Sequence, residues 1–262
     1  MSEIVAPILD IQNLSMVFGG LRAIDHVSLH IKSGEICALI GPNGAGKTTI
    51  FNCVTGVYKP TEGSIAIQHG EHPKEEIQGL KPNTINLKGL ARTFQNIRLF
   101  SNMSVLENVM IGRHNSLKAS IFNAILRDRA TKEEEQRVID ESHDILKKMK
   151  LEMFINETAR NLPYGAQRRL EIARALATDP FLLLLDEPVA GMNPNETKEL
   201  EETINIIRDK EKVTILLIEH DMSLVMNVSE RIYVLDYGRL IAEGTPMEIK
   251  ANPEVIKAYL GE

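Results

Sequence analysis

The stretch of sequence that decides the fold reads Gly41-Pro42-Asn43-Gly44-Ala45-Gly46-Lys47-Thr48. It follows the apolar run Cys37 to Ile40, which has the length of a buried strand, and it precedes a helical stretch beginning at Thr49. A strand, a loop of the form Gly-x-x-x-x-Gly-Lys-Ser/Thr and a helix together make a phosphate-binding loop. A glycine-rich turn that matches by chance would not explain the strand and the helix on either side. The sequence therefore predicts a nucleotide site in an α/β fold.

The loop offers several contacts to a bound nucleotide. Its glycines let consecutive backbone N–H groups face phosphate oxygens, and the N-terminus of the following helix adds positive potential. Lys47 is expected to reach the β- and γ-phosphates, and Thr48 to ligate Mg²⁺. We therefore predict ATP and Mg²⁺ as the cofactors. The predicted nucleotide-binding residues of this loop are Gly41, Pro42, Asn43, Gly44, Ala45, Gly46, Lys47, Thr48 and Thr49.

A second apolar run, Phe181 to Leu185, ends in the two carboxylates Asp186 and Glu187. The carboxyl end of a strand is where α/β sheets place their ligands. Asp186 is positioned to hold the metal through water, and Glu187 to polarise a water for in-line attack on the γ-phosphate. Two acids after a strand often only begin a loop, but the nearby phosphate-binding loop favours the catalytic interpretation.

Composition limits the possible architectures and locations. The 262 residues, 43% of them hydrophobic, suffice for one large domain or for a core with an attached subdomain. The longest uncharged apolar runs, Phe181 to Leu185 and Val213 to Ile218, are far shorter than the ~20 residues of a membrane span. The N-terminus shows no basic and apolar signal sequence, so the cytoplasm is the expected location.

Charge and cysteine content exclude further classes. A net charge of −6 without a long basic run argues against a nucleic-acid surface, so we expect protein or small-molecule partners. Cys37 and Cys53 both sit in apolar surroundings and are interpreted as small buried hydrophobic residues. Neither residue suggests a disulfide or a metal site.

The apolar patterning predicts two kinds of sheet and a helical insert. Val27, Leu29 and Ile31 alternate with polar residues, which indicates antiparallel strands. Continuous apolar runs alternate with helical stretches farther along the chain, as in a buried parallel sheet. Residues 102–161 show only helical spacing among charged residues, and residues 69–88 are interpreted as surface loops or short hairpins. The predicted fold class is α/β: a nucleotide-binding core with a parallel sheet, an antiparallel β subdomain and an inserted α-helical subdomain.

A third segment narrows the class. The run Leu162-Pro163-Tyr164-Gly165-Ala166-Gln167-Arg168-Arg169-Leu170-Glu171-Ile172-Ala173-Arg174-Ala175-Leu176 resembles the signature motif of ABC transporter ATPases. Gln95 and His220 complete the order and spacing of that family over nearly the whole chain. The resemblance implies a single ABC ATPase domain over residues 1–262. Within it we expect a core of residues 8–95 and 166–245, a helical subdomain of residues 96–165 and a helical tail of residues 246–262.

The resemblance also implies roles for individual residues. Two subunits would pack head to tail, so that ATP is buried between the loop of one and the signature of the other, here Pro163, Tyr164, Gly165 and Ala166. The predicted catalytic residues are Glu187, His220, Gln95 and Lys47, and the predicted metal ligands are Thr48, Gln95 and Asp186. Phe18 would stack on adenine, although a place in the hydrophobic core is an alternative for it.

Two departures from the family pattern matter. The signature usually begins Leu-Ser-Gly-Gly-Gln, whereas Pro163 here replaces the serine, which removes its hydroxyl contact to the γ-phosphate. Asn193 stands in the dimer-contact loop where Asp is common. Both changes favour an unequal partner subunit, although the sequence is compatible with either a homodimer or a heterodimer.

A finer resemblance points to the ATPases of branched-chain amino acid importers. It rests on residues 91–100, the Tyr164-Gly165 pair with Arg168 to Ile172, residues 187–194 and the tail from Gly244 to Gly261. It implies a second ABC ATPase subunit, membrane-spanning permease subunits, indirectly a substrate-binding protein, and a peripheral place at the cytoplasmic face of the cell membrane. Ile97, Leu99, Phe100 and Met103 would form a groove for a permease helix. The alternatives are the ATPase of a lipid-exporting ABC system and a soluble, non-transport ABC ATPase.

Overall fold

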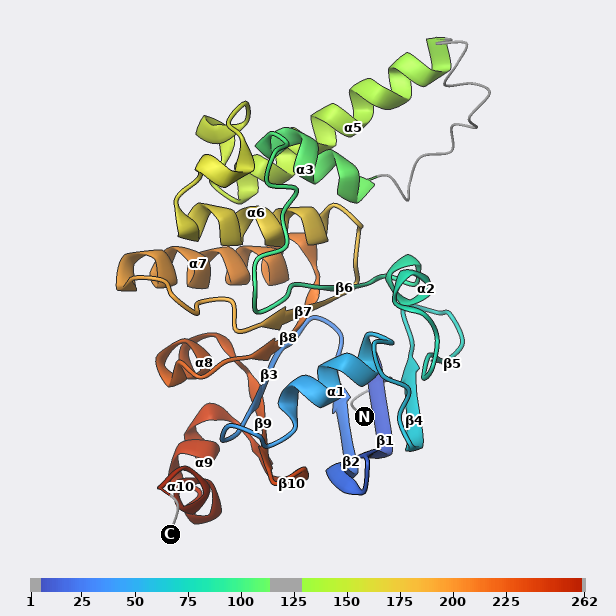
Figure 1. Cartoon of the computed structure of the whole chain (residues 1–262), viewed down its shortest axis with the longest axis vertical. Coiled ribbons are helices and arrows are strands. Elements are labelled where there is room, and N and C mark those ends of the chain that lie inside the picture. The colour runs from blue at the N-terminus through green and yellow to red at the C-terminus, as the bar shows by residue number, and fades with distance from the viewer. Residues whose placement is uncertain (1–5, 114–128, 261–262) are drawn as a thin grey trace, which may run out of the picture.

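The computed structural model describes residues 6–113 and 129–260 and contains two β-sheets in these ranges (Figure 1). The six-stranded sheet has the order β10-β9-β3-β8-β7-β6, and the four-stranded sheet has the order β2-β1-β4-β5. The strands are β1 (Leu9–Phe18), β2 (Leu21–Ile31), β3 (Ile36–Ile40), β4 (Glu62–Ile67), β5 (Glu75–Glu76), β6 (Leu90–Arg92), β7 (Leu182–Asp186), β8 (Thr214–Ile218), β9 (Arg231–Asp236) and β10 (Arg239–Gly244).

The six-stranded sheet is parallel except for its edge strand β10. β3 pairs in parallel with β8 and β9, and β7 pairs in parallel with β6 and β8, whereas β10 runs antiparallel to β9. Every residue of β3, β7 and β8 is buried. Strands covered on both faces need apolar side chains on both, which explains why these segments are continuous apolar runs.

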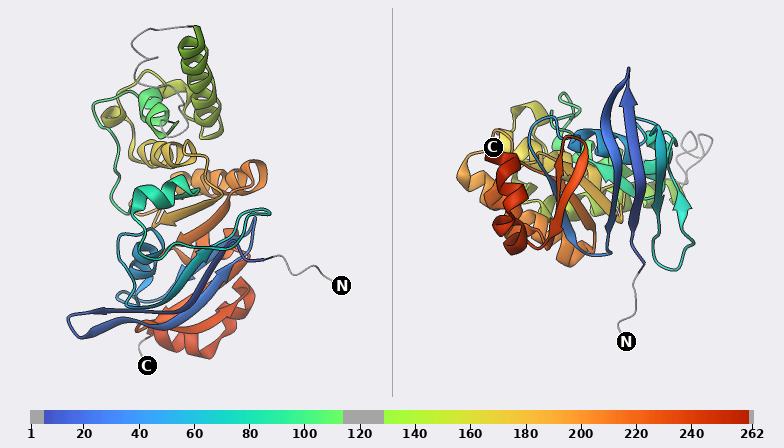
Figure 2. Two further views of the ribbon diagram at one scale, coloured as in Figure 1. Left: turned by 90° about the vertical axis from the view of Figure 1, so that its right-hand side faces the viewer. Right: turned by 90° about the horizontal axis from the view of Figure 1, so that it is seen from below.

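The four-stranded sheet is antiparallel. β1 pairs with β2 and β4, and β4 pairs with the two-residue strand β5. Val27, Leu29 and Ile31 of β2 are buried, whereas Ser28 between them is exposed, as their period-two pattern predicts. Figure 2 shows this sheet, in blue to cyan, as a layer beside the orange and red strands of the six-stranded sheet.

Helices cover both faces of the six-stranded sheet. In Figure 1, α3, α5, α6 and α7 stack on one side of it and α1 lies on the other. The helices of the described ranges are α1 (Lys47–Val54), α2 (Pro82–Leu87), α3 (Val105–Gly112), α5 (Arg129–Lys148), α6 (Tyr164–Leu176), α7 (Pro194–Glu211), α8 (Met222–Val228), α9 (Pro246–Ala251) and α10 (Pro253–Leu260), with the 3₁₀ turns Glu152–Phe154 and Ala159–Asn161.

The two faces of the six-stranded sheet build two separate hydrophobic clusters. Alternate side chains of β3 point to opposite faces, so Ala38 and Ile40 join one cluster and Cys37 and Leu39 join the other. The first cluster packs against α3, α5, α6, α7 and α8, and the second packs against α1 and the four-stranded sheet. The six-stranded sheet, whose strand β3 precedes the predicted phosphate-binding loop, is therefore packed on both faces.

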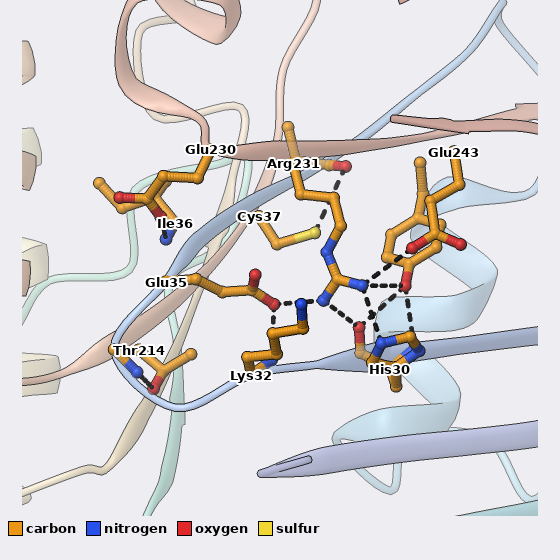
Figure 3. Close-up of polar contacts among 12 residues, drawn as sticks. His30, Lys32, Glu35, Ile36, Cys37, Thr214, Glu230, Arg231 and Glu243 are labelled. Atoms are coloured by element: carbon orange, nitrogen blue, oxygen red, sulfur yellow. Dashed lines mark hydrogen bonds and ion pairs between the residues drawn. The ribbon is translucent and has the colours of Figure 1, made fainter. Parts of the chain in front are cut away.

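Arg231 ties the two sheets together at the start of β9 (Figure 3). Its Nη1 donates to Glu243 Oε1 and contacts His30 Nε2, both at 2.9 Å. Its Nη2 donates to the His30 carbonyl oxygen at 2.7 Å and to Glu35 Oε1 at 2.5 Å. Burial opposes the charge, but the hydrogen bond and the charge of Glu35 raise the pKa of Arg231 overall. The cluster fixes β2 against β9 at the amino end of the parallel strands.

The structure agrees with the predicted α/β class, with its parallel and antiparallel sheets. Cys37 and Cys53 are buried and free, as predicted. Residues 69–88 are not only loops and hairpins, because they also contain α2, whose six residues are too few to show helical periodicity. Pro82 begins that helix at a position that proline favours. Among the described residues, no helix has the length and apolar character that a membrane crossing requires.

Candidate active site

The carboxyl ends of four adjacent strands bring the predicted residues together. In the order β3-β8-β7-β6, the phosphate-binding loop follows β3, His220 follows β8, Glu187 follows β7 and Gln95 follows β6. Ligands of open α/β sheets bind outside this edge, where parallel strands end side by side. The insertion of β8 between β3 and β7 therefore places His220 and Glu187 beside the loop.

The loop takes a path that only glycine allows at two positions. Gly41 has a φ of 151°, and a Cβ there would lie 2.1 Å from the Leu235 carbonyl oxygen. Gly46 has a φ of 103°, and a Cβ there would lie 2.5 Å from Ile24 Cδ1. The loop is thus pressed against β9 on one side and β2 on the other, and α1 begins directly after it at Lys47.

Lys47 is buried and folds back over its own loop. Its Nζ donates to the Gly41 carbonyl oxygen at 2.7 Å and to the Pro42 carbonyl oxygen at 2.9 Å. Burial lowers the pKa of Lys47, and the charges of Glu187 and Asp186 act in the opposite direction. A cation held only by neutral carbonyls can exchange them for phosphate oxygens, which form stronger, charge-assisted hydrogen bonds.

Glu187 links the two side chains that the sequence pairs with it. Its Oε2 accepts a hydrogen bond from Gln95 Nε2 at 2.7 Å, and its Oε1 lies 3.0 Å from His220 Nε2. The backbone of Glu187 has a φ of 49°, which is uncommon for a residue other than glycine. This turn directs the carboxylate across the ends of β6 and β8, and backbone strain of this kind is concentrated at functional sites.

Asp186 forms an ion pair with Arg92 that the sequence analysis did not predict. Arg92 Nη2 lies 2.6 Å from Asp186 Oδ2, and the two side chains are only 7% and 4% exposed. Arg92 Nη1 also donates to Asn52 Oδ1 at 2.7 Å and to Thr55 Oγ1 at 3.2 Å, both on or next to α1. The Arg92 contacts therefore fix the orientation of the Asp186 side chain at the end of β7.

Glu219 joins the loops that follow β7 and β8. Its Oε1 accepts from the Val189 N–H at 2.9 Å, and its Oε2 accepts from the N–H groups of His220 at 2.8 Å and Asp221 at 3.1 Å. Burial raises the pKa of the Glu219 carboxyl, although these backbone donors act against the rise. Glu219 thereby sets the position of the His220 backbone relative to the Glu187 loop.

The side chains available for a metal are all oxygen donors. Thr48 contributes a hydroxyl, Asp186 a carboxylate and Gln95 an amide carbonyl, a set that suits a hard cation such as Mg²⁺ completed by phosphate oxygens and water. In the ranges 6–113 and 129–260 no group of three or more His, Cys, Asp and Glu side chains could hold a metal ion by itself. This donor set fits a metal that arrives together with a nucleotide.

The signature residues lie at the start of α6 and not at the strand ends that carry the phosphate-binding loop, His220, Glu187 and Gln95 (Figure 1). Pro163 and Tyr164 are exposed, whereas Gly165 and Ala166 are buried. A Cβ on Gly165 would lie 2.7 Å from Glu196 Oε1, so an α7 carboxylate packs against the first turn of α6. The phosphate-binding loop thus belongs to β3 and α1, whereas the signature belongs to α6.

Two further predicted residues have local partners. Phe18 ends β1 with 39% of its surface exposed, and its ring contacts Tyr58 edge to face at a centroid distance of 5.2 Å. An exposed ring of this kind is not part of the hydrophobic core. Asn193 caps α7, where its Oδ1 accepts from the N–H groups of Asn195 at 3.0 Å and Glu196 at 3.1 Å.

Three residues of the site region escaped the sequence analysis: Arg92, Glu219 and Arg168. Arg92 lies three residues before Gln95, Glu219 directly precedes His220, and Arg168 lies inside the signature. Their partners lie far away in the sequence, so no local spacing could identify them. For Glu219 the available signal was a charged residue directly at the end of the apolar run Val213 to Ile218, since buried charges are seldom left unpaired.

Comparisons with known proteins show the family of this chain. The family model "ABC transporter" matches residues 24–190, and the model "Branched-chain amino acid ATP-binding cassette transporter" matches residues 239–262. The high-affinity branched-chain amino acid transport ATP-binding protein LivG of Salmonella typhimurium is 49% identical over 256 residues, which is 98% of each chain. The corresponding BraF protein of Pseudomonas aeruginosa is 46% identical over 98% of each chain.

A solved structure confirms the predicted fold. MJ1267, an ATP-binding cassette of an ABC transporter in its ADP conformation, is 32% identical to this chain, with a TM-score of 0.83. The match covers 98% of this chain and 100% of that one. Because relatives that match 98% of the chain and this solved structure point to the same family, the chain belongs to the ATPase family of ABC transporters, in the group of branched-chain amino acid transport ATP-binding proteins.

Proposed function

We propose that this chain binds ATP with Mg²⁺ and hydrolyses it to drive an importer of branched-chain amino acids. The observation that carries the catalytic part is the Glu187 carboxylate held between Gln95 and His220 beside the phosphate-binding loop. The names of the relatives and the match of residues 239–262 support the cargo. The proposed domain is one ABC ATPase unit with a core of residues 8–95 and 166–245, a helical subdomain of residues 96–165 and a helical tail of residues 246–262.

In the proposed hydrolysis, the protein positions the nucleotide and the attacking water and forms no covalent bond to them. The backbone N–H groups of residues 41–49 and the Lys47 ammonium hold the phosphates, and Phe18 stacks on the adenine ring. Glu187 accepts a hydrogen bond from the attacking water and orients it in line with the bond to be broken. His220 contacts Glu187 and would donate to the γ-phosphate.

Mg²⁺ would be held by Thr48, Gln95 and Asp186, with Asp186 acting through a water molecule. When bound, the ion neutralises charge that develops on the β- and γ-phosphate oxygens. The Gln95 Nε2 donates to Glu187, so its carbonyl oxygen is the atom that would face the metal. Gln95 would therefore couple the metal to the carboxylate that orients the water.

The complete site would form between two ATPase subunits. Pro163, Tyr164, Gly165 and Ala166 open α6, and the N–H groups of a helix N-terminus favour an anion. We propose that they face the γ-phosphate held by a second ABC ATPase subunit. Membrane-spanning permease subunits would bind the pair at the cytoplasmic face of the membrane, and a substrate-binding protein would deliver the amino acid to them.

Copurification and transport test this function directly. The chain should purify with membrane subunits, and the complex in proteoliposomes with a binding protein should accumulate labelled leucine only with ATP and Mg²⁺. ATP-dependent release of lipid without leucine uptake would instead support a lipid exporter. Purification without any membrane subunit, together with ATP hydrolysis, would support a soluble ABC ATPase.

A surface groove supports the contact with a permease. It has a volume of about 500 Å³ and is lined by Leu99 and Phe100, together with Arg98, Ile111 and Arg174. Phe100 is 47% exposed, and the Arg174 guanidinium lies 5.4 Å from the centre of its ring. Of the other predicted groove residues, Ile97 and Met103 are half-buried. An exposed aromatic ring beside arginines in a surface groove is typical of a protein-binding surface.

Phe100→Asp should therefore uncouple transport. The change would replace the exposed aromatic ring with a carboxylate, so a permease helix would lose its contact with the ring and ATP-driven leucine uptake should fall about tenfold or more. Binding of ATP by the isolated chain should stay within twofold of normal, since Phe100 is outside the nucleotide site. The matched control is Tyr237→Asp in the β9–β10 turn, where an aromatic ring is 87% exposed. Equal uptake by both variants would contradict the docking role.

Pro163→Ser should strengthen ATP-dependent association. Proline offers neither a hydroxyl nor an N–H donor, and a hydrogen bond to a charged group contributes about 1.5–3 kcal/mol. In a Glu187→Gln background, restoring the serine should raise the ATP-dependent dimer constant about tenfold or more, measured by sedimentation. The Glu196 carboxylate beside Gly165 further weakens anion binding at this helix end. A dimer fraction that stays constant or falls would refute the missing hydroxyl as the reason for an unequal partner.

A further inference from the structure

Arg168 is a fully buried arginine in α6, and its guanidinium donates hydrogen bonds to the loop that carries Gln95. Its Nη1 donates to the Phe94 carbonyl oxygen at 2.6 Å, and its Nη2 donates to the Gln95 carbonyl oxygen at 2.7 Å. Glu171, one turn farther along the helix, balances the charge at 2.9 Å. A buried arginine is costly unless it is paired, so this contact defines one position for the loop.

Glu171 holds the same loop at a third point. Its Oε1 accepts a hydrogen bond from the Arg98 N–H at 3.1 Å, and its side chain is 2% exposed. The Phe94 ring is meanwhile packed between two guanidinium groups, Arg92 at 5.1 Å and Arg98 at 4.1 Å. The loop from Phe94 to Arg98 is therefore fastened to α6 mainly by charged side chains and not by a strand or helix ladder.

Tyr164 connects Arg168 to the surface of the protein. Its hydroxyl lies 3.4 Å from Arg168 Nη2, and 42% of the residue is exposed at the start of α6. Its ring also lies against the loop before α7, because a Cβ on Gly191 would come within 3.4 Å of Tyr164 Cε1. Tyr164 thus touches both Arg168 and the segment expected to face a second subunit.

We propose that Tyr164 and Arg168 are positioning residues that couple the partner-facing surface of α6 to the catalytic carboxylate. The path runs from the Tyr164 hydroxyl to Arg168, from Arg168 to the Gln95 backbone, and from the Gln95 side chain to Glu187 at 2.7 Å. We call this path of contacts from Tyr164 through Arg168 and Gln95 to Glu187 the latch. It rests on the proposed function, in which a nucleotide held by a second subunit approaches the start of α6. A second subunit that displaces Tyr164 then shifts the Gln95 loop, and with it the carboxylate.

The latch acts through small displacements. Gln95 reaches Glu187 by its side chain while its own carbonyl oxygen is fixed by Arg168, so a movement of the backbone moves the amide directly. A misplacement of about 1 Å in an active site can cost about 10²-fold in rate. Loss of the Arg168 contacts should therefore lower kcat strongly. KM for ATP should stay nearly unchanged, because the recorded contacts of Tyr164 and Arg168 do not include the chain's own phosphate-binding loop.

Three variants of the full-length chain test the latch. Tyr164→Phe removes only the hydroxyl, Arg168→Lys keeps the charge but cannot span both carbonyls, and Arg168→Met removes both functions. We measure kcat and KM for ATP, and amide hydrogen exchange of residues 94–98 with and without ATP. The control is Arg169→Met, because the neighbouring Arg169 is also buried but pairs with Glu199 of α7 at 2.7 Å.

Arg168→Met is expected to lower kcat about tenfold or more and to speed exchange at 94–98, with Arg168→Lys between it and the wild type. Tyr164→Phe should keep slow exchange without ATP but lose the change that ATP induces there. Arg169→Met should show wild-type exchange at 94–98. If Arg168→Met does not fold, Arg168→Lys and Tyr164→Phe decide alone.

Wild-type exchange in both conservative variants would overturn the proposal. A loss of kcat without any change at residues 94–98 would also overturn it, because the effect would then act by another route. The exchange measurement needs no permease and no cargo, so its failure is distinct from failure of the proposed transport function. That function fails instead if the wild-type complex takes up no labelled leucine.

Discussion

Glu187→Gln is expected to slow ATP hydrolysis about 10²-fold or more while ATP binding persists. The amide has nearly the same shape as the carboxylate, but it lacks the negative charge that orients the attacking water. It would also present an N–H₂ group toward either Gln95 or His220, both of which now contact a carboxylate oxygen. Steady-state phosphate release measures the rate, and binding of a fluorescent ATP analogue measures the affinity.

The matched control for this prediction is Glu201→Gln on α7, an identical chemical change at a half-buried carboxylate outside the predicted site. We expect its hydrolysis rate to stay within twofold of normal. Because the Glu187 variant binds ATP without consuming it, ATP-dependent dimers should also last longer in that background. Near-normal phosphate release by Glu187→Gln would show that another group orients the water.

Arg92→Met is expected to reduce the free energy of unfolding by about 3–5 kcal/mol. It removes the partner of a carboxylate that is only 4% exposed and leaves Asp186 buried without its ion pair. The hydrogen bonds to Asn52 and Thr55 are lost as well, so the end of α1 loses its contact with β6. Urea unfolding of the nucleotide-free chain, followed by circular dichroism, measures the change.

A second substitution separates the ion pair from simple packing. If the cost comes from an uncompensated charge, the double variant Arg92→Met with Asp186→Leu should recover most of the lost stability, since it removes both charges. Arg92→Lys should lose less than Arg92→Met, because it keeps a positive charge near Asp186. A decrease in the free energy of unfolding of less than about 1 kcal/mol for Arg92→Met would contradict the prediction, because it would be no larger than that of an exposed surface ion pair.

The sequence by itself determined the local elements of the site. The pattern from Gly41 to Thr48 requires a glycine loop between a strand and a helix, and the structure places it between β3 and α1. The carboxylates after Leu185 end β7, and His220 follows β8, as their apolar runs predict. These inferences succeed because a turn, a strand end and a helix start depend on neighbouring residues, whose chemistry is written in a short segment.

Only the tertiary structure decided the order of the strands and the partners of the buried charges. Nothing local shows that β8 lies between β3 and β7, which brings His220 to Glu187. The contacts of Arg92 with Asp186 and of Arg168 with the Gln95 carbonyl oxygen join segments far apart in the chain. Such pairs form because burial on two sheet faces brings charges together that must compensate one another, and burial is a property of the whole packed core.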